Sequence, residues 1–114
     1  MKDTLQSLKA LSEEIRVRLV LLLMGREACV CELMAVFDMA QSKLSHHLIT
    51  LRDAGFVRTE RRGKWNYYRA HPAAMSGINK DLIASLSKSL EDDGIIERDH
   101  RTLENVQRKM QICC

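Results

Sequence analysis

The sequence predicts a mainly α-helical domain with one small β-hairpin. Apolar residues recur at intervals of three and four over most of the 114 residues, which is the periodicity of helices with one buried face. The stretch between Phe56 and Ala70 instead has the aromatic content and central turn of two paired strands. One Pro and five Gly argue against a disordered or repetitive chain, and this length has room for one compact domain.

Two helices are expected before residue 26. The first has leucines on one face, at Leu5, Leu8 and Leu11. The second has an apolar stripe made of Ile15, Leu19, Leu22 and Leu23. We expect Ser12 to cap the start of the second helix and Gly25 to end it.

A pair of short helices joined by a tight turn is expected between residues 30 and 55. Residues 30–37 form a short apolar segment, and the next three residues, 38–40, are typical of a turn. The second helix begins at Gln41 or Ser42, carries Leu44, Leu48 and Leu51 at helical spacing, and ends at Gly55. Two short helices around a tight turn form a helix-turn-helix.

Two strands follow, over residues 56–62 and 65–70, around a turn at Arg62-Gly63-Lys64. A helix-turn-helix followed by a basic hairpin is the outline of a winged helix-turn-helix domain, which we assign to residues 1–90. Residues 73–90 carry an apolar stripe that so small a chain cannot fully bury, made of Met75, Ile78, Leu82, Leu86 and Leu90, so we expect a dimer. Residues 91–114 are expected to form an amphipathic tail that ends in Cys113-Cys114.

The charge distribution points to a polyanionic partner. Residues 40–70 contain seven basic and two acidic residues, a net charge of +5, whereas the whole chain carries +3 and the remainder therefore −2. The start of the second motif helix offers donors and acceptors to base edges in a major groove, from Gln41, Ser42, Lys43, Ser45 and His46. The hairpin tip offers phosphate contacts from Arg61, Arg62 and Lys64. Double-stranded DNA is the expected partner.

Each of these residues also has a simpler interpretation. Ser42 would then only cap its helix, His46 would be a solvated surface histidine, and the basic hairpin tip would merely be exposed to solvent. We expect His47 to be packed, since it lies beside Leu44 and Leu51 at helical spacing. The wing aromatics Trp65, Tyr67 and Tyr68 are expected in the wing core, because stacking on bases requires single strands.

The cysteines are expected to act in a reducing compartment. No run of about 18 apolar residues is present, and the first residues lack the apolar segment of a secretory signal, so we expect a cytoplasmic protein without a membrane partner. There, cysteines favour metal ligands or redox thiols over a disulfide framework. No resident cofactor is expected to be required.

The motifs together resemble one family. The segments EACVCELM and QSKLSHHLITLRDAGFVRTERRGKWNYYRAHP closely resemble the ArsR/SmtB family of metal- and metalloid-responsive winged-helix repressors, over about residues 5–90. The resemblance implies a homodimer that represses a palindromic operator when empty and leaves it when an inducer binds.

The resemblance also implies a role for the cysteines. Cys29-Val-Cys31 stands where the trivalent-arsenic sensors of the family have their first two ligands, and soft As(III) or Sb(III) prefers thiolates. The third cysteine of that pattern is Met34 here. Cys113 or Cys114 would complete the site, or would form a separate two-thiol site suited to methylated As(III), or would be incidental exposed thiols. Because residues i and i+2 lie about 200° apart on a helix, joint binding is expected to distort the helix start.

Other function classes remain as alternatives. The zinc-sensing pattern is absent, since residues 73–90 contain no His and only one acidic residue, Asp81. A cadmium- or lead-responsive repressor is disfavoured because no cysteine precedes Cys29, and a thiol redox sensor on the same scaffold stays open. A small thiol oxidoreductase is the remote alternative: no C-x-x-C motif or phosphate loop is present, so we expect a protein that is not an enzyme.

Overall fold

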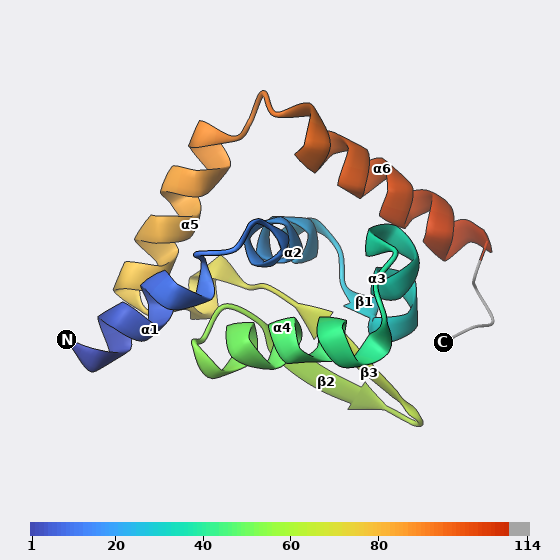
Figure 1. The fold of residues 1–114 in the computed structure, drawn as a ribbon, viewed down its shortest axis with the longest axis horizontal. Helices are drawn as coiled ribbons and strands as arrows, with labels where there is room; N and C mark the ends of the chain where they lie inside the picture. Colours follow the sequence, from blue (N-terminus) through green and yellow to red (C-terminus); the bar gives the residue numbers. More distant parts are fainter. Residues whose placement is uncertain (110–114) are drawn as a thin grey trace.

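Five helices and a small sheet surround a central helix in the computed structural model, which describes residues 1–109 (Figure 1). The elements are, in order, α1 (Lys2–Ala10), α2 (Glu14–Gly25), β1 (Ala28–Cys29), α3 (Val30–Phe37), α4 (Gln41–Asp53), β2 (Arg58–Arg62), β3 (Trp65–Arg69), the 3-10 turn η1 (Pro72–Ala74), α5 (Gly77–Ser89) and α6 (Gly94–Lys109). The prediction of a mainly helical domain with a β-hairpin wing is confirmed.

Helix α2 occupies the middle of the molecule because it is apolar nearly all the way round. All five residues from Leu19 to Leu23 are buried, so α2 packs on several sides rather than along the single stripe that its sequence predicts. The surrounding elements contribute the rest of the core, chiefly Leu33, Leu44, Leu48, Leu51, Phe56, Ile83 and Leu103.

The start of α2 differs from the prediction. Its N-cap residue is Glu13, and the hydroxyl of Ser12 instead donates to the carbonyl oxygen of Lys9 at 2.6 Å. Ser12 still belongs to the turn that ends α1, whose last carbonyl groups have no partner within the helix and therefore attract the hydroxyl. The expected Ser12 cap of α2 is wrong.

Helices α3 and α4 form the predicted helix-turn-helix. The turn places Asp38 in the left-handed region, with φ of 49°, which a short Asp side chain tolerates better than most. Helix α4 begins at Gln41 behind the N-cap residue Ala40, which makes no side-chain capping bond. Ser42 is therefore the second residue of the helix, so the interpretation of Ser42 as a simple helix cap is wrong.

The sheet has one strand more than the sequence predicts. Its order is β1-β3-β2, with all neighbours antiparallel, and β1 pairs Ala28 with Tyr68 and Cys29 with Tyr67. The β2–β3 hairpin turns at Gly63, whose φ of 61° suits glycine. Strand β1 attaches the first cysteine directly to the wing.

The wing aromatics do not share one environment. Tyr68 is 8% exposed and faces the core, whereas Trp65 is 39% exposed. Side chains alternate along a strand, so Trp65 and Tyr68, three residues apart, point to opposite faces of β3. The expectation that all three aromatics form the wing core is confirmed for Tyr68 and wrong for Trp65. Tyr67, on the same face of β3 as Trp65, is half-buried beneath the guanidinium of Arg62 and lies outside the core cluster.

The last two helices close the structure around α2. Helix α5 starts after its capping residue Ser76 and lies beside α1, and α6 returns across α2 and α3 (Figure 1). Arg18 of α2 donates two hydrogen bonds of 2.8 Å to the buried carboxylate of Asp99, which ties α6 to the core. No helix among residues 1–109 is long and apolar enough to cross a membrane.

Candidate functional site

The start of α4 presents polar side chains to solvent. Gln41, Ser42, Lys43 and His46 are exposed and Ser45 is half-buried. The leucines of the opposite face, Leu44, Leu48 and Leu51, are fully buried. Because the leucines pack against the core, the polar side chains at the start of α4 face outward. A helix that enters a groove of DNA needs polar side chains at this position.

His47 supports α4 from behind. It is 5% exposed, and its Nδ1 atom accepts from a guanidinium N–H of Arg16 at 3.3 Å. Arg16 in turn donates to the carbonyl oxygen of Ala10 at 2.8 Å. Burial lowers the pKa of His47 below its ordinary value, and the charge of Arg16 lowers it further. The prediction that His47 is a packed histidine is confirmed.

The three basic residues at the wing tip differ in their surroundings. All three are exposed, and the Nε group of Arg61 donates to the carbonyl oxygen of Gly63 at 3.1 Å. Arg62 instead pairs with the carboxylates of Glu27 and Glu60 and lies over the ring of Tyr67. Some of the hydrogen-bond donors of its guanidinium are therefore already used within the protein. The pairing with Arg62 also lowers the pKa of Glu27.

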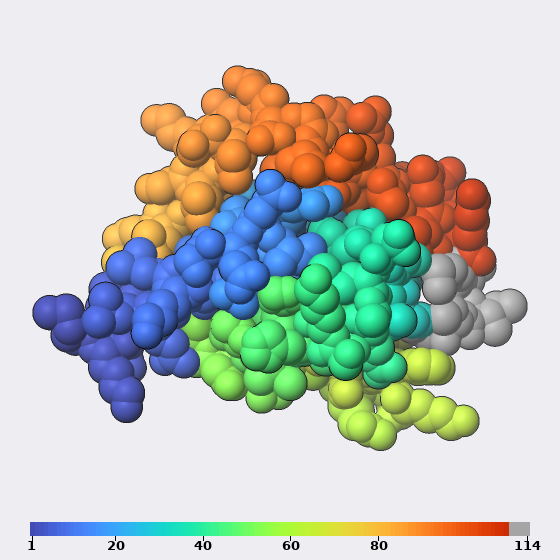
Figure 2. Space-filling view, viewed as in Figure 1, coloured from blue at the N-terminus to red at the C-terminus, as the bar shows by residue number. Residues whose placement is uncertain are grey.

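The helix start and the wing tip share one side of the molecule. In Figure 2 the green surface of α4 and the yellow-green wing lie together along the lower edge. A duplex on this edge would meet α4 and the wing at once, which is the arrangement that a winged helix uses on DNA.

Cys29 and Cys31 lie close together at the end of β1 and the start of α3. Cys29 is the N-cap residue of α3, with extended backbone (φ −92°, ψ 168°), and Cys31 lies in the first turn. Their sulfur atoms, called the sulfur pair below, are 3.6 Å apart. Two sulfurs on one ion lie about 3.3–3.8 Å apart, for a bond of about 2.3 Å and an angle of about 90–110°.

The observed separation therefore already fits joint coordination. The expected distortion on binding assumed that both cysteines lie inside the helix, and this premise is wrong because Cys29 is the N-cap residue. An extended residue at the N-cap does not follow the helical rotation of about 100° per residue, so its side chain can turn toward that of the second residue after it.

A hollow of about 240 Å³ opens beside the sulfur pair. We call it the cysteine hollow. Its lining comes from β1, α3, α4 and the wing, namely Cys29, Val30, Cys31, Met34, Gln41, Lys64, Trp65 and Asn66. Sequence spacing gave no signal for this arrangement, which depends on how three separate segments pack. The structure thus places two predicted DNA contacts, Gln41 and Lys64, at the predicted ligand site.

The other two predicted ligands, Cys113 and Cys114, lie outside the described residues. Within residues 1–109 no three His, Cys, Asp or Glu side chains form a group that could hold a metal ion. Met34, which stands where the resemblance implies a third cysteine, does line the cysteine hollow.

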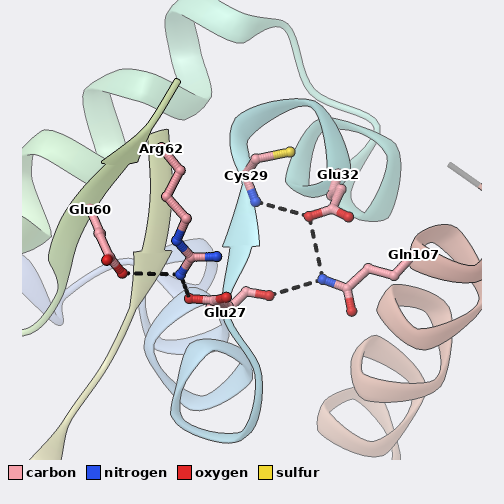
Figure 3. Close-up of polar contacts among 6 residues, drawn as sticks. All are labelled: Glu27, Cys29, Glu32, Glu60, Arg62 and Gln107. Carbon is pink, nitrogen blue, oxygen red and sulfur yellow. Dashed lines mark hydrogen bonds and ion pairs between the residues drawn. The ribbon is translucent and has the colours of Figure 1, made fainter. Parts of the chain in front are cut away.

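A polar network behind the cysteines was not predicted from the sequence. Figure 3 shows that the backbone N–H of Cys29 donates to Glu32 at 2.9 Å and that Gln107 donates to Glu32 and to the carbonyl oxygen of Glu27. Glu32 stands three residues after the N-cap, where a capping carboxylate belongs, and this spacing is visible in the sequence. The contacts of Gln107 could not be predicted from the local sequence, since they depend on how α6 packs.

Helices α1 and α5 pack against each other at the left end of the molecule and carry exposed apolar side chains (Figure 2). Leu5, Leu8 and Ile78 are each at least 40% exposed. Exposed apolar side chains grouped on neighbouring helices are typical of a protein interface.

Comparisons with known proteins agree with this geometry. The family described as "Bacterial regulatory protein, arsR family" matches residues 13–59. The chain is 45% identical over 75 residues to the arsenic resistance transcriptional regulator ArsR1 of Pseudomonas putida, covering 65% of this chain and 59% of that protein. It is 36% identical over 90 residues to the arsenical resistance operon repressor of Bacillus subtilis, covering 77% of this chain and 86% of that repressor. The chain belongs to the ArsR family.

Solved structures of ArsR-like fold support the same assignment. HlyU from Vibrio cholerae matches with a TM-score of 0.65 and 30% identity, over 77% of this chain and 91% of that one. The transcriptional repressor BigR from Xylella fastidiosa matches with a TM-score of 0.61 and 31% identity, over 77% and 86%. The winged helix-turn-helix prediction is confirmed. Membership of the ArsR family also makes this chain a transcriptional regulator rather than an enzyme, as predicted.

Proposed function

We propose that this ArsR-family chain is a homodimeric repressor that binds a palindromic operator and releases it when trivalent arsenic or antimony binds cysteine thiolates. The cysteine hollow carries the proposal, since it joins the sulfur pair, Gln41 of α4 and Lys64 of the wing. A ligand bound there lies against two side chains that would face DNA.

Operator binding is supported by the lower edge of the molecule. Gln41, Ser42, Lys43, Ser45 and His46 would contact base edges or phosphates from the start of α4. Arg61 and Lys64 would contact phosphates of the flanking DNA. Arg62 would do so less, because leaving Glu27 and Glu60 would expose two carboxylates to the DNA.

The inducer class follows from the donor atoms. Two sulfurs at 3.6 Å suit a soft ion, and soft trivalent arsenic or antimony takes three sulfur ligands in a pyramid. We propose that Cys113 or Cys114 supplies the third thiolate. Methylated As(III), which needs two thiolates, would bind at the sulfur pair alone or at Cys113-Cys114.

Release would follow from crowding in the cysteine hollow. The cysteine thiols must lose their protons to bind the ion as thiolates, so binding releases protons and depends on pH. The bound ion and its third ligand would displace Gln41 and Lys64 from their DNA-binding positions, a coupling typically of about 1–3 kcal/mol or more. The reducing cytoplasm, where thiols persist, is the proposed site of action.

The dimer would form through α1 and α5. Leu5, Leu8 and Ile78 would be covered by the same face of a second copy, related by a two-fold axis. Two copies of α4 would then meet half-sites about one helical turn apart. The names of the relatives, an arsenic resistance transcriptional regulator and an arsenical resistance operon repressor, support the proposal of a repressor.

Binding of the reduced wild-type chain to duplex DNA tests the proposal. An operator is selected from a random-sequence pool, and its complex is titrated with arsenite, with cadmium and with peroxide, each in a separate experiment. We expect release by arsenite in the presence of a metal-free reductant. Release by peroxide alone would establish a redox sensor instead, release by cadmium alone a cadmium sensor, and absence of any sequence-specific duplex binding would contradict the repressor.

A further inference from the structure

One side-chain amide of α6 holds both flanks of the segment that carries the sulfur pair. The Nε2 group of Gln107 donates to the carbonyl oxygen of Glu27 at 2.9 Å and to Oε1 of Glu32 at 3.3 Å (Figure 3). The same Oε1 atom accepts the backbone N–H of Cys29 at 2.9 Å. Gln107 thus connects the residue two before Cys29 with the residue after Cys31.

The partners of Gln107 determine the orientation of its amide. Its Oε1 atom accepts from the guanidinium of Arg26 at 3.0 Å. A guanidinium can only donate, whereas the carbonyl oxygen of Glu27 and the carboxylate of Glu32 can only accept. Only one of the two amide orientations satisfies all three partners. A glutamine suits this position for that reason, since a carboxylate there would have no proton to donate.

We infer that Gln107 is a positioning residue that holds Cys29 and Cys31 ready for the inducer, an inference that rests on the proposed function. Glu32 is 8% exposed, and its carboxylate fixes the extended backbone of Cys29 through the N–H that it accepts. Gln107 holds this carboxylate in place. Groups that orient metal ligands in this way typically contribute about 10–100-fold to affinity.

Gln107 bonds the segment that carries the sulfur pair and, among the described residues, makes no hydrogen bond to a side chain proposed to contact DNA. It bonds the backbone oxygen of Glu27, whereas the carboxylate of Glu27 pairs with Arg62 of the wing. Its helix, α6, packs on α2 and α3, while Gln41 and Lys64 belong to α4 and the wing. Loss of the amide should therefore change the inducer response and leave operator binding unchanged.

The test compares Gln107→Met, which keeps the length of the side chain but makes no such bonds, with Asn105→Ala on the same helix. Asn105 is exposed and, among residues 1–109, its amide bonds only the exposed Arg108, so this variant is the matched control. Each reduced full-length variant is titrated with arsenite on the operator duplex, and its operator Kd is measured without arsenite.

For Gln107→Met we expect an operator Kd within about twofold of wild type and a half-release arsenite concentration raised about tenfold or more. Hydrogen exchange at the backbone amide of Cys29 should also become faster. Asn105→Ala should change none of these quantities. Gln107→Ala provides the same measurements if Gln107→Met fails to fold.

The outcomes separate this inference from the proposed function. If wild type responds to arsenite and Gln107→Met responds at the same concentration, the inference is overturned and the proposed function stands. If Gln107→Met loses operator binding without arsenite, Gln107 is structural and the inference is again overturned. If wild-type protein binds the operator but ignores arsenite, both are overturned.

Discussion

Replacing Arg18 by Ala is expected to destabilise the protein more than replacing its partner Asp99 by Ala. Without Arg18, the carboxylate of Asp99, whose side chain is 5% exposed, loses two hydrogen bonds of 2.8 Å and stays buried as an unpaired charge. Breaking a buried pair in this way costs about 3–5 kcal/mol of unfolding free energy.

Replacing Asp99 by Ala is expected to lower the unfolding free energy by less. Arg18 then keeps Glu14 at 3.6 Å and the ring of Phe37 at 5.1 Å, and its side chain, 17% exposed, can turn its charged end toward solvent. We expect a loss of about 1.5–3 kcal/mol, the range for hydrogen bonds to charged groups. The double variant Arg18→Met/Asp99→Leu should recover most of the stability, since apolar side chains can replace a buried pair.

Urea unfolding followed by far-ultraviolet circular dichroism measures these differences. The protein concentration must be held constant, because dimerisation would itself add to the apparent stability. Equal losses for the two single variants, or a larger loss for Asp99→Ala, would refute the assignment of the buried charge to Asp99.

Three further predictions concern other parts of the molecule. Leu8→Glu, at a half-exposed position on α1, should sediment as a folded monomer with weak operator binding; a persistent dimer would place the interface elsewhere. Gln41→Ala should lower the preference for operator over random duplex by about 1–3 kcal/mol. Lys64→Ala should weaken binding to both duplexes alike and reduce the slope of log K against log salt concentration by about 0.9 per phosphate contact. The reverse pattern would exchange the roles proposed for Gln41 and Lys64. Burial lowers the pKa of His47, so as the pH falls the unfolded chain binds a proton at this histidine before the folded protein does. The unfolding free energy should therefore fall as the pH drops below about 6.5. In urea unfolding, His47→Gln should show a smaller fall than wild type, and an unchanged pH dependence in this variant would contradict the prediction.

The sequence predicted the helices and the hairpin because leucine spacing and turn residues act locally. Leu44, Leu48 and Leu51 have the spacing that buries one face of α4, and Gly63 has the left-handed backbone that its turn requires. Strand β1 was missed because two residues carry no periodicity. The neighbour of β1 in the sheet, β3, lies about 40 residues away in the chain, and pairing at that distance has no local signature.

The site was predictable in its residue types and not in its arrangement. Cysteine spacing and resemblance identified Cys29 and Cys31, yet their 3.6 Å separation depends on the extended backbone at the N-cap. The exposure of Trp65 and the pairing of Arg62 with Glu27 depend on which face of the sheet each side chain takes and on what packs there. Such contacts between distant segments follow only from the three-dimensional structure.

The fluorescence of Trp65 tests most directly whether the inducer binds in the cysteine hollow. Trp65 is the only tryptophan of the chain, and it lines the hollow together with Cys29 and Cys31. Arsenite added to reduced wild-type protein should change the emission of Trp65 and saturate at about one ion per subunit, with the metalloid held by soft thiolate ligands. Cys29→Ser and Cys31→Ser should bind the operator and show neither the emission change nor release. Release of the operator by arsenite with unchanged Trp65 emission, or a full response in either cysteine variant, would contradict the account.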